Sequence, residues 1–297
     1  MSYTKETAMV NANTFVLPAM MDSGFDREDL GDDFEGLQLS FKKFKIPGGG
    51  MTQFEEPGDD PENPEYVKNI EGIIVYNHAS NAYWAAGSEY DDSSMPLCSS
   101  FDGKSGFGTP GGSCQVCPMN QYGTDMSGGK GKACKNMRTL YILRSGEAMP
   151  IQLSLPPTSL RPFTDFVNAV FVTRQRPTWT AIVQIGLKRQ DNGTNQYSVA
   201  TFRKIDDLAP EQLVQMRQYA ASFRAQAKEM QQQRALEAVN RSSGDEGFDA
   251  AVFLKSALFV CLGILAFGIV VRLLFGKKSL VNSAVSSAIG ILFIYAI

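Results

Sequence analysis

The sequence predicts an α+β fold that is mainly β, and three observations support this prediction. Short runs of alternating or β-branched residues recur through the first two thirds of the chain. The last two of these runs flank Asn192-Gly193, a strong hairpin signal because both residues tolerate positive φ. A long amphipathic pattern then follows, typical of a helix that docks on a core.

Six segments are expected to form strands, and they occupy residues 36–46, 70–77, 137–144, 150–156, 178–189 and 196–204. A helix is predicted between the fourth and fifth of them, at 158–171, with Thr158 or Ser159 as its cap and Pro162 in its first turn. With three of the strands ahead of the helix, the order of three strands, a helix and two closing strands matches a five-stranded barrel of the oligonucleotide-binding (OB) type. A split α+β sheet explains the same order and remains open.

The pattern divides the chain into five regions. An acidic, largely irregular arm at 1–35 precedes an OB-like core at 36–208, which carries an insertion at 95–136. An amphipathic helix at 209–238 follows, with its apolar stripe running from Leu213 to Met230. A polar linker at 239–250 then leads to an apolar region at 251–297.

The formal charge of −3 hides an uneven distribution. Residues 1–65 carry a net charge of −9, whereas residues 128–204 carry +9. Such asymmetry suggests a polyanionic partner for the basic segment. The acidic arm is expected to bind partner proteins or to shield the basic face.

Four cysteines fall in the insertion at 95–136: Cys98, Cys114, Cys117 and Cys134. In a chain without a secretory signal, a C-x2-C pair with two further cysteines is typical of tetrahedral zinc. The surrounding residues are mostly glycine, serine and polar, so a structural Zn²⁺ would supply missing folding free energy. An iron–sulfur cluster and disulfides are the competing interpretations. The sole histidine, His78, is not needed as a ligand.

Basic and aromatic residues alternate through the +9 segment, as single-strand nucleic-acid binding requires. Lysine and arginine would contact phosphates, while flat rings would stack on bases. The alternative is that the aromatic rings fill the core and the lysine and arginine side chains form a solvated face. The candidate contact residues are Lys130, Lys132, Lys135, Arg138, Tyr141, Arg144, Arg174, Arg176, Trp179, Lys188, Arg189, Tyr197, Arg203 and Lys204.

Catalysis is not expected. The acidic pairs Asp32/Asp33, Glu55/Glu56 and Asp59/Asp60 would suit a metal-dependent nuclease, but they lie in loops and neighbouring side chains point apart. No convincing base or nucleophile accompanies them, so the sequence predicts a non-catalytic protein.

The apolar region predicts a membrane anchor. Residues 257–275 reach about the 20 residues that cross a bilayer, and a second apolar stretch at 280–297 would complete a hairpin. One span or two, and the orientation, stay open, because Arg272, Lys277 and Lys278 would lie on the outer side. A buried apolar hairpin is the alternative. We expect the protein at the bacterial inner membrane, with its body in the cytoplasm.

The stretch from Gly36 to Arg234, including PGDDPENPEY, GTPGGSCQVCPMN and GKACKNMRTLYILRSGE, resembles uncharacterised proteins of phages and conjugative elements of Gram-positive bacteria. By analogy alone, a zinc loop in an OB barrel is similar to phage single-stranded-DNA-binding proteins. We therefore expect a membrane-tethered protein that binds single-stranded DNA, with RNA as a further candidate. The alternative is a membrane-embedded structural or assembly protein of a virion or secretion apparatus, with a zinc-stabilised interaction domain. Homo-oligomers fit either function.

Overall fold

The chain folds as a mixed α+β structure in which strands predominate. The structure, a computed structural model, describes residues 11–18, 41–58, 60, 63–84, 96–125, 129–193 and 195–245. Its main sheet has nine strands. They are β1 (Lys43–Phe44), β4 (Asn69–Tyr83), β5 (Cys98–Ser100), β6 (Ser105–Gly108), β7 (Gly112–Ser113), β8 (Lys135–Leu143), β9 (Ile151–Leu155), β10 (Ala181–Asp191) and β11 (Gln196–Asp207).

A small second sheet pairs β2 (Phe54–Glu56) with β3 (Glu65–Val67). The α-helices are α2 (Pro157–Val170) and α3 (Pro210–Asp245). Short 3-10 helices join these elements, among them η2 (Pro118–Asn120), η3 (Val172–Arg174) and η4 (Thr178–Thr180).

The long strand β4 organises the sheet. It pairs with β8 over residues 73–82, with β10 over 69–73 and with β5 over 81–83. Its first part therefore belongs to the β10–β11 side of the sheet, and its last part carries the strands that hold the cysteines. Gly72 permits the close approach to β8, since a Cβ there would lie 2.5 Å from the Leu143 carbonyl oxygen.

The predicted OB-like five-stranded barrel is wrong, because the sheet is open. Among the described residues, β1 pairs only with β9 and β11 pairs only with β10, so these two strands do not close a ring. The insertion is also less separate than expected. Its strands β5, β6 and β7 extend the main sheet through β4.

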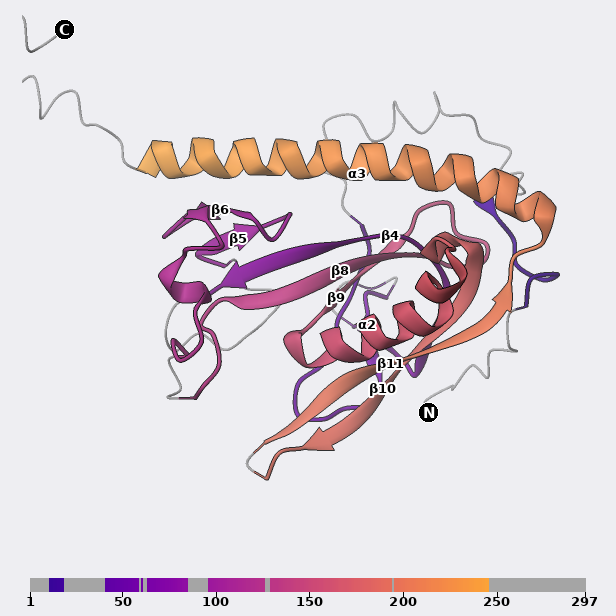
Figure 1. Cartoon of the computed structure of the whole chain (residues 1–297), viewed down its shortest axis with the longest axis horizontal. Helices are drawn as coiled ribbons and strands as arrows, with labels where there is room; N and C mark the ends of the chain where they lie inside the picture. The colour runs from indigo at the N-terminus through magenta and orange to yellow at the C-terminus, as the bar shows by residue number, and fades with distance from the viewer. Residues whose placement is uncertain are drawn as a thin grey trace, which may run out of the picture. The chain divides into compact units, whose positions relative to one another are not determined.

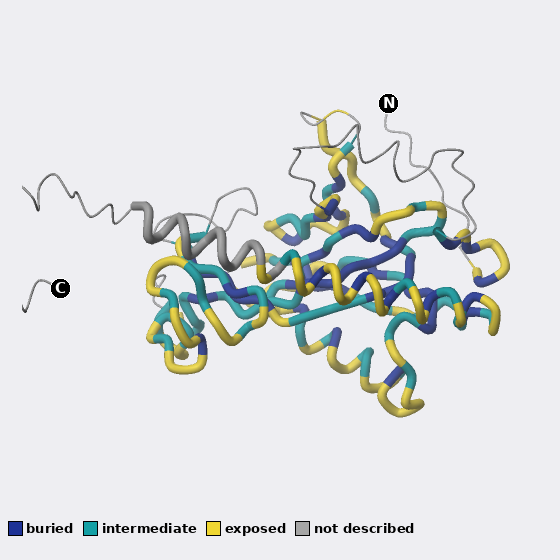
Figure 2. Tube along the Cα trace, turned by 90° about the horizontal axis from the view of Figure 1, so that it is seen from above, coloured by how far each residue is buried: buried dark blue, intermediate teal, exposed yellow. Residues whose placement is uncertain are grey.

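A helix lies against each face of the sheet, with α2 on one side and α3 on the other (Figure 1). Strand β8 shows why: Leu140 and Ile142 belong to the core under α2, while Tyr141 and Leu143 belong to the core under α3. Alternation along a strand sends successive side chains to opposite faces. Burial is accordingly concentrated on the central strands (Figure 2).

The two predicted helices are confirmed, with a difference at the start of α2 and another at the end of α3, which continues to Asp245 through residues predicted to begin the polar linker. The N-cap of α2 is Pro156, so Pro162 lies inside the helix and not in its first turn. Ser159 is not a cap. Its buried hydroxyl accepts a hydrogen bond from the Ala200 backbone N–H at 2.9 Å, which joins α2 to β11.

The predicted hairpin at Asn192-Gly193 is confirmed. Gly193 has φ of +86°, and its N–H donates to the Asp191 carboxylate at 2.6 Å. Strands β10 and β11 pair on either side of this turn from Asp191↔Gln196 to Ala181↔Asp207. Of the expected strand at 36–46, only Lys43–Phe44 is a strand among the described residues.

Part of the predicted acidic arm packs on the core, although its described residues form turns and irregular backbone as expected. Phe15 and Leu17 are 2% and 1% exposed and belong to the core under α3. Gln212 of α3 donates to the Ala12 carbonyl at 2.8 Å, and Val16 N–H donates to Ser145. All of the acidic residues of that arm lie outside the described residues.

No helix within the described ranges is long and apolar enough to span a bilayer. The predicted spans at 251–297 lie outside those ranges.

Candidate four-cysteine site

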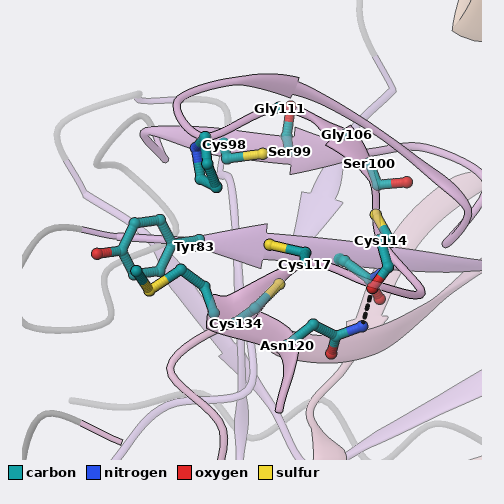
Figure 3. A pocket seen from close by; sticks show the side chains of 13 residues that line it. Tyr83, Cys98, Ser99, Ser100, Gly106, Gly111, Cys114, Cys117, Asn120 and Cys134 are labelled. Carbon is teal, nitrogen blue, oxygen red and sulfur yellow. Dashed lines mark hydrogen bonds between the residues drawn. The ribbon is translucent and has the colours of Figure 1, made fainter. Parts of the chain in front are cut away.

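The fold brings the four clustered cysteines to one pocket. Cys98 begins β5, Cys114 follows β7 directly, Cys117 caps η2, and Cys134 directly precedes β8. All four line the same small pocket, as Figure 3 shows. Residues up to 36 positions apart in the sequence thus meet at the end of the sheet where β4, β5 and β8 are neighbours.

Gly106 on β6 leaves room beside two of the sulfur atoms. A Cβ built there would lie 3.0 Å from Cys98 Sγ and 3.7 Å from Cys114 Sγ. These two thiols therefore border the same point in space, which a larger side chain would occupy.

The thiols also influence one another electrostatically. Burial, followed by the neighbouring charges of Cys114, Cys98 and Cys117, raises the pKa of Cys134 to about 11. Burial likewise raises the pKa of Cys98, against the opposing effect of a hydrogen bond from the Gly111 backbone. The pocket therefore favours the neutral thiols of Cys98 and Cys134, whereas a bound metal ion would reverse that preference.

Hydrogen bonds within the insertion hold two of the cysteines in place. Asn120 Nδ2 donates to the Cys114 carbonyl at 2.7 Å, drawn as the dashed line in Figure 3. The Cys134 backbone N–H donates to the Met119 carbonyl at 2.8 Å. Thr124 accepts from the Ala133 N–H at 3.0 Å and donates to the Gln121 carbonyl at 2.7 Å.

The turn between β5 and β6 is held by Asp102. Its Oδ1 accepts hydrogen bonds from the backbone N–H groups of Lys104 and Ser105, at 2.7 and 2.9 Å, and from the Ser100 hydroxyl at 3.0 Å. Partial burial alone would raise the pKa of Asp102, but these donors bring it below its ordinary value.

The sulfur atoms do not yet stand in ligand positions. In the part of the chain that the structure describes, no three His, Cys, Asp or Glu side chains are grouped closely enough to hold an ion as they stand. The backbone has gathered the cysteines, and rotation of the side chains about χ1 remains as the step that would draw the sulfurs together.

A second feature of the same insertion is an exposed aromatic ring beside two lysines. Tyr122 is 82% exposed, and Lys132 Nζ lies 4.9 Å from the centre of its ring. Lys130 is exposed. Its backbone lies beside that of Tyr122, because the Lys130 carbonyl accepts a hydrogen bond from the Gly123 N–H at 3.2 Å. We call Tyr122, Lys130 and Lys132 the Tyr122 patch.

Many of the other predicted nucleic-acid contacts are held by the protein's own oxygens. Arg144 pairs with Glu56 and Glu147, Lys135 pairs with Asp125, and Arg176 and Lys204 both pair with Asp207. Four further arginines donate to neutral oxygens of the chain: Arg138, Arg174, Arg189 and Arg203. Lys188 is exposed on β10.

The prediction that Tyr141 stacks on bases is wrong. Tyr141 is 4% exposed, because α3 covers that face of the sheet and Phe223 packs 5.2 Å from its ring. Trp179 packs against the same core and is partly buried, and Tyr197 is half-buried. The single-sequence pattern did not show that α3 would return across this face.

The residues that support the site were not identified from the sequence. Gly106, Asn120, Thr124 and Asp102 were part of a loop described only by its composition. Tyr122 was missed because it precedes the basic segment, which was counted from residue 128. An aromatic residue inside a cysteine-bearing polar loop was the available signal.

No protein-family model, curated protein or solved structure matches the chain.

Proposed function

We propose that this protein is a non-catalytic single-stranded nucleic-acid-binding protein of a phage or conjugative element, tethered to the inner membrane through residues 251–297. The observation that carries this proposal is the Tyr122 patch. A largely exposed ring with the Lys132 ammonium 4.9 Å from its centre, and with exposed Lys130 nearby in the same loop, suits a stacked base whose phosphates lie against lysines.

The charge around the ring supports the proposal. Among the described residues, Lys130 and Lys132 make no ion pair with a carboxylate, in contrast to Lys135, which pairs with Asp125 at 3.5 Å. Lys130 is exposed, and Lys132 is partly exposed, with its Nζ donating to the neutral Asn120 Oδ1 at 3.3 Å. An ammonium group that has no internal counterion can replace the counterions of a phosphate backbone. The proposed nucleic-acid contact surface therefore contains fewer residues than the fourteen expected from the sequence.

The test is fluorescence anisotropy of the full chain in detergent with a labelled poly-dT oligonucleotide over a salt series. We expect Tyr122→Ala to weaken binding by about 1–3 kcal/mol, the value of one base stacked on an aromatic ring. Lys130→Gln and Lys132→Gln should each reduce the slope of log K against log salt by about 1.

Matched control variants lie elsewhere on the surface. Tyr66 on β3 is also an exposed tyrosine, at 50%, so Tyr66→Ala should bind as the parent does. Arg161→Gln removes an exposed charge from α2 and should leave the slope unchanged. Equal losses for Tyr122→Ala and Tyr66→Ala, or no binding at low salt, would overturn the proposal. Liposomes of anionic lipid serve as the competitor that tests a lipid-binding patch.

A second function is favoured by one observation. Leu97 and Val116, both in the insertion, are 48% and 75% exposed and are apolar. A structural or assembly protein would use such residues, with the four-cysteine site as a rigid base for a protein contact. This second function predicts oligomers that are stable in detergent and that the Val116→Asp variant dissociates. It also predicts that the protein has no affinity for oligonucleotides.

A further inference from the structure

The insertion has almost no core of its own. Among the described residues from 96 to 134, the buried ones are Ser100, Cys114 and Cys134. Its two phenylalanines, Phe101 and Phe107, are only half-buried, with ring centres 6.5 Å apart. A segment of this length that buries so little apolar surface needs another source of folding free energy.

Its four cysteines are the residues placed to supply that energy. They reach the pocket from three directions: β5 for Cys98, the Cys114–Asn120 turn for Cys114 and Cys117, and the entry to β8 for Cys134. Hydrogen bonds of the insertion's backbone and of Asn120 hold these segments in place. Figure 3 shows the sulfur atoms arranged around the same space.

We propose that Cys98, Cys114, Cys117 and Cys134 bind a single Zn²⁺ as a closed, structural tetrathiolate site. Four thiolates satisfy the tetrahedral preference of zinc and leave no position for substrate. On binding, each of the four thiols loses its proton to solvent, and no electrons are transferred. Zn–S bonds of about 2.3 Å then require side-chain movements that bring the four sulfurs inward.

Gly106 is the positioning residue for this centre. A Cβ at this position would lie 3.0 Å from Cys98 Sγ, tighter than nine in ten real Cβ contacts, so the Cys98 side chain would have to shift on the side of the pocket that Cys98 and Cys114 share. Glycine at 106 therefore keeps the sulfurs free to turn toward the ion, although it is not itself a ligand.

The first measurement is the metal content and thiol reactivity of the purified full chain. We expect one zinc per chain and four thiols that react with an aromatic disulfide reagent only after a strong chelator is added. Cobalt(II) in place of zinc should give the intense visible bands of a tetrahedral thiolate complex. Substoichiometric zinc with freely reacting thiols, disulfides under non-reducing mass spectrometry, or bound iron and sulfide would each overturn the proposal.

Variants then assign the ligands and the positioning residue. Cys117→Ala should abolish stoichiometric zinc, whereas Cys261→Ser, the fifth cysteine, should keep it. Gly106→Ala should lower the affinity for cobalt with all four ligands intact, and its control is Gly48→Ala, where a Cβ meets no atom within 4 Å. Equal cobalt affinity for the two glycine variants would contradict the role of Gly106. None of these readouts depends on nucleic-acid binding, so this proposal and the proposed function fail separately.

Discussion

Arg144 Nη2 lies 3.0 Å from the carboxylate of Glu56, and the Glu56 side chain is only 6% exposed. Lys42 contacts the same carboxylate at 2.8 Å, and the Arg144 guanidinium also covers the ring of Phe44. This ion-pair network joins the small β2–β3 sheet to the end of β8. A carboxylate so buried is tolerated because two cations compensate its charge.

Removing one partner of this network should therefore be costly. We expect Arg144→Ala to lower the free energy of unfolding by about 3 kcal/mol, the lower end of the range for a broken buried pair, since Arg144 itself is 27% exposed. The measurement is urea unfolding followed by circular dichroism. Lys45→Ala removes the partly exposed pair with Glu55 and should change stability by less than about 1 kcal/mol. Similar losses in the two variants would contradict a special role for Glu56.

The packing of α3 on the sheet depends on Phe223. Its ring contacts Phe41 at 5.5 Å and Tyr141 at 5.2 Å between centres, and it is 3% exposed. Phe223→Ala should cost about 3–5 kcal/mol, the range for large-to-small changes in a core. Tyr141 should then become accessible to iodination or to fluorescence quenchers. Val214→Ala, at an exposed site on the same helix, is the control for changes in helix propensity.

Alkaline pH should weaken the same helix contact through Tyr219. Burial raises the pKa of this phenol to about 12, and its hydroxyl donates to the Ala148 carbonyl at 3.0 Å. Because the folded pKa lies above the ordinary value of 10, the folded state holds its proton longer than the unfolded chain. The stabilisation is complete below pH 10 and is lost as the pH rises toward 12. Tyr219→Phe should show a smaller fall in stability across this window, and an unchanged fall would refute the assignment.

The sequence predicted those elements whose signals are local. The Asn192-Gly193 turn, the runs that became β8 to β11 and the periodicity of α3 each depend on near neighbours, and the structure confirms them. The open sheet was not predictable in this way, because it depends on β4 exchanging partners along its length between Asn69 and Tyr83.

The candidate site likewise combines a feature that the sequence predicted with features that it did not. The C-x2-C spacing predicted that the cysteines would gather, and they line one pocket. The space at Gly106 and the exposure of Tyr122 arise from how β6 and the following loop fold, which no spacing records. Tyr141 was assigned to the wrong environment because strand alternation fixes two faces without identifying the face that a distant helix covers.

Acid should loosen the β5–β6 turn before it affects the sheet core. The donors around Asp102 lower the pKa of its carboxylate below 3.8, so its contribution to stability is present above that pH and is lost as the pH falls through the lowered pKa. Asp102→Ala should remove this acid-dependent step and make the turn exchange amide hydrogens faster at neutral pH. Asp165→Ala, on an exposed helix site, should leave both unchanged. Unchanged amide hydrogen exchange at Lys104 and Ser105 in the Asp102→Ala variant would contradict the proposed role of Asp102 in holding this turn.

Removal of the proposed zinc should unfold the insertion without unfolding the sheet. Neither of the two apolar core clusters contains a residue between 96 and 134, so the core has no direct dependence on that segment. Such a segment opens as a separate cooperative unit when its own stabilisation is withdrawn.

Hydrogen exchange with mass spectrometry, run with and without a strong chelator, should show loss of protection confined to the insertion and the end of β4 that pairs with β5. Peptides from α2 and β10 serve as the internal control, and Cys117→Ala should reproduce the chelated pattern without chelator. Loss of protection throughout the sheet would mean that the metal holds the whole fold, and no loss anywhere would mean that the insertion is stable without it.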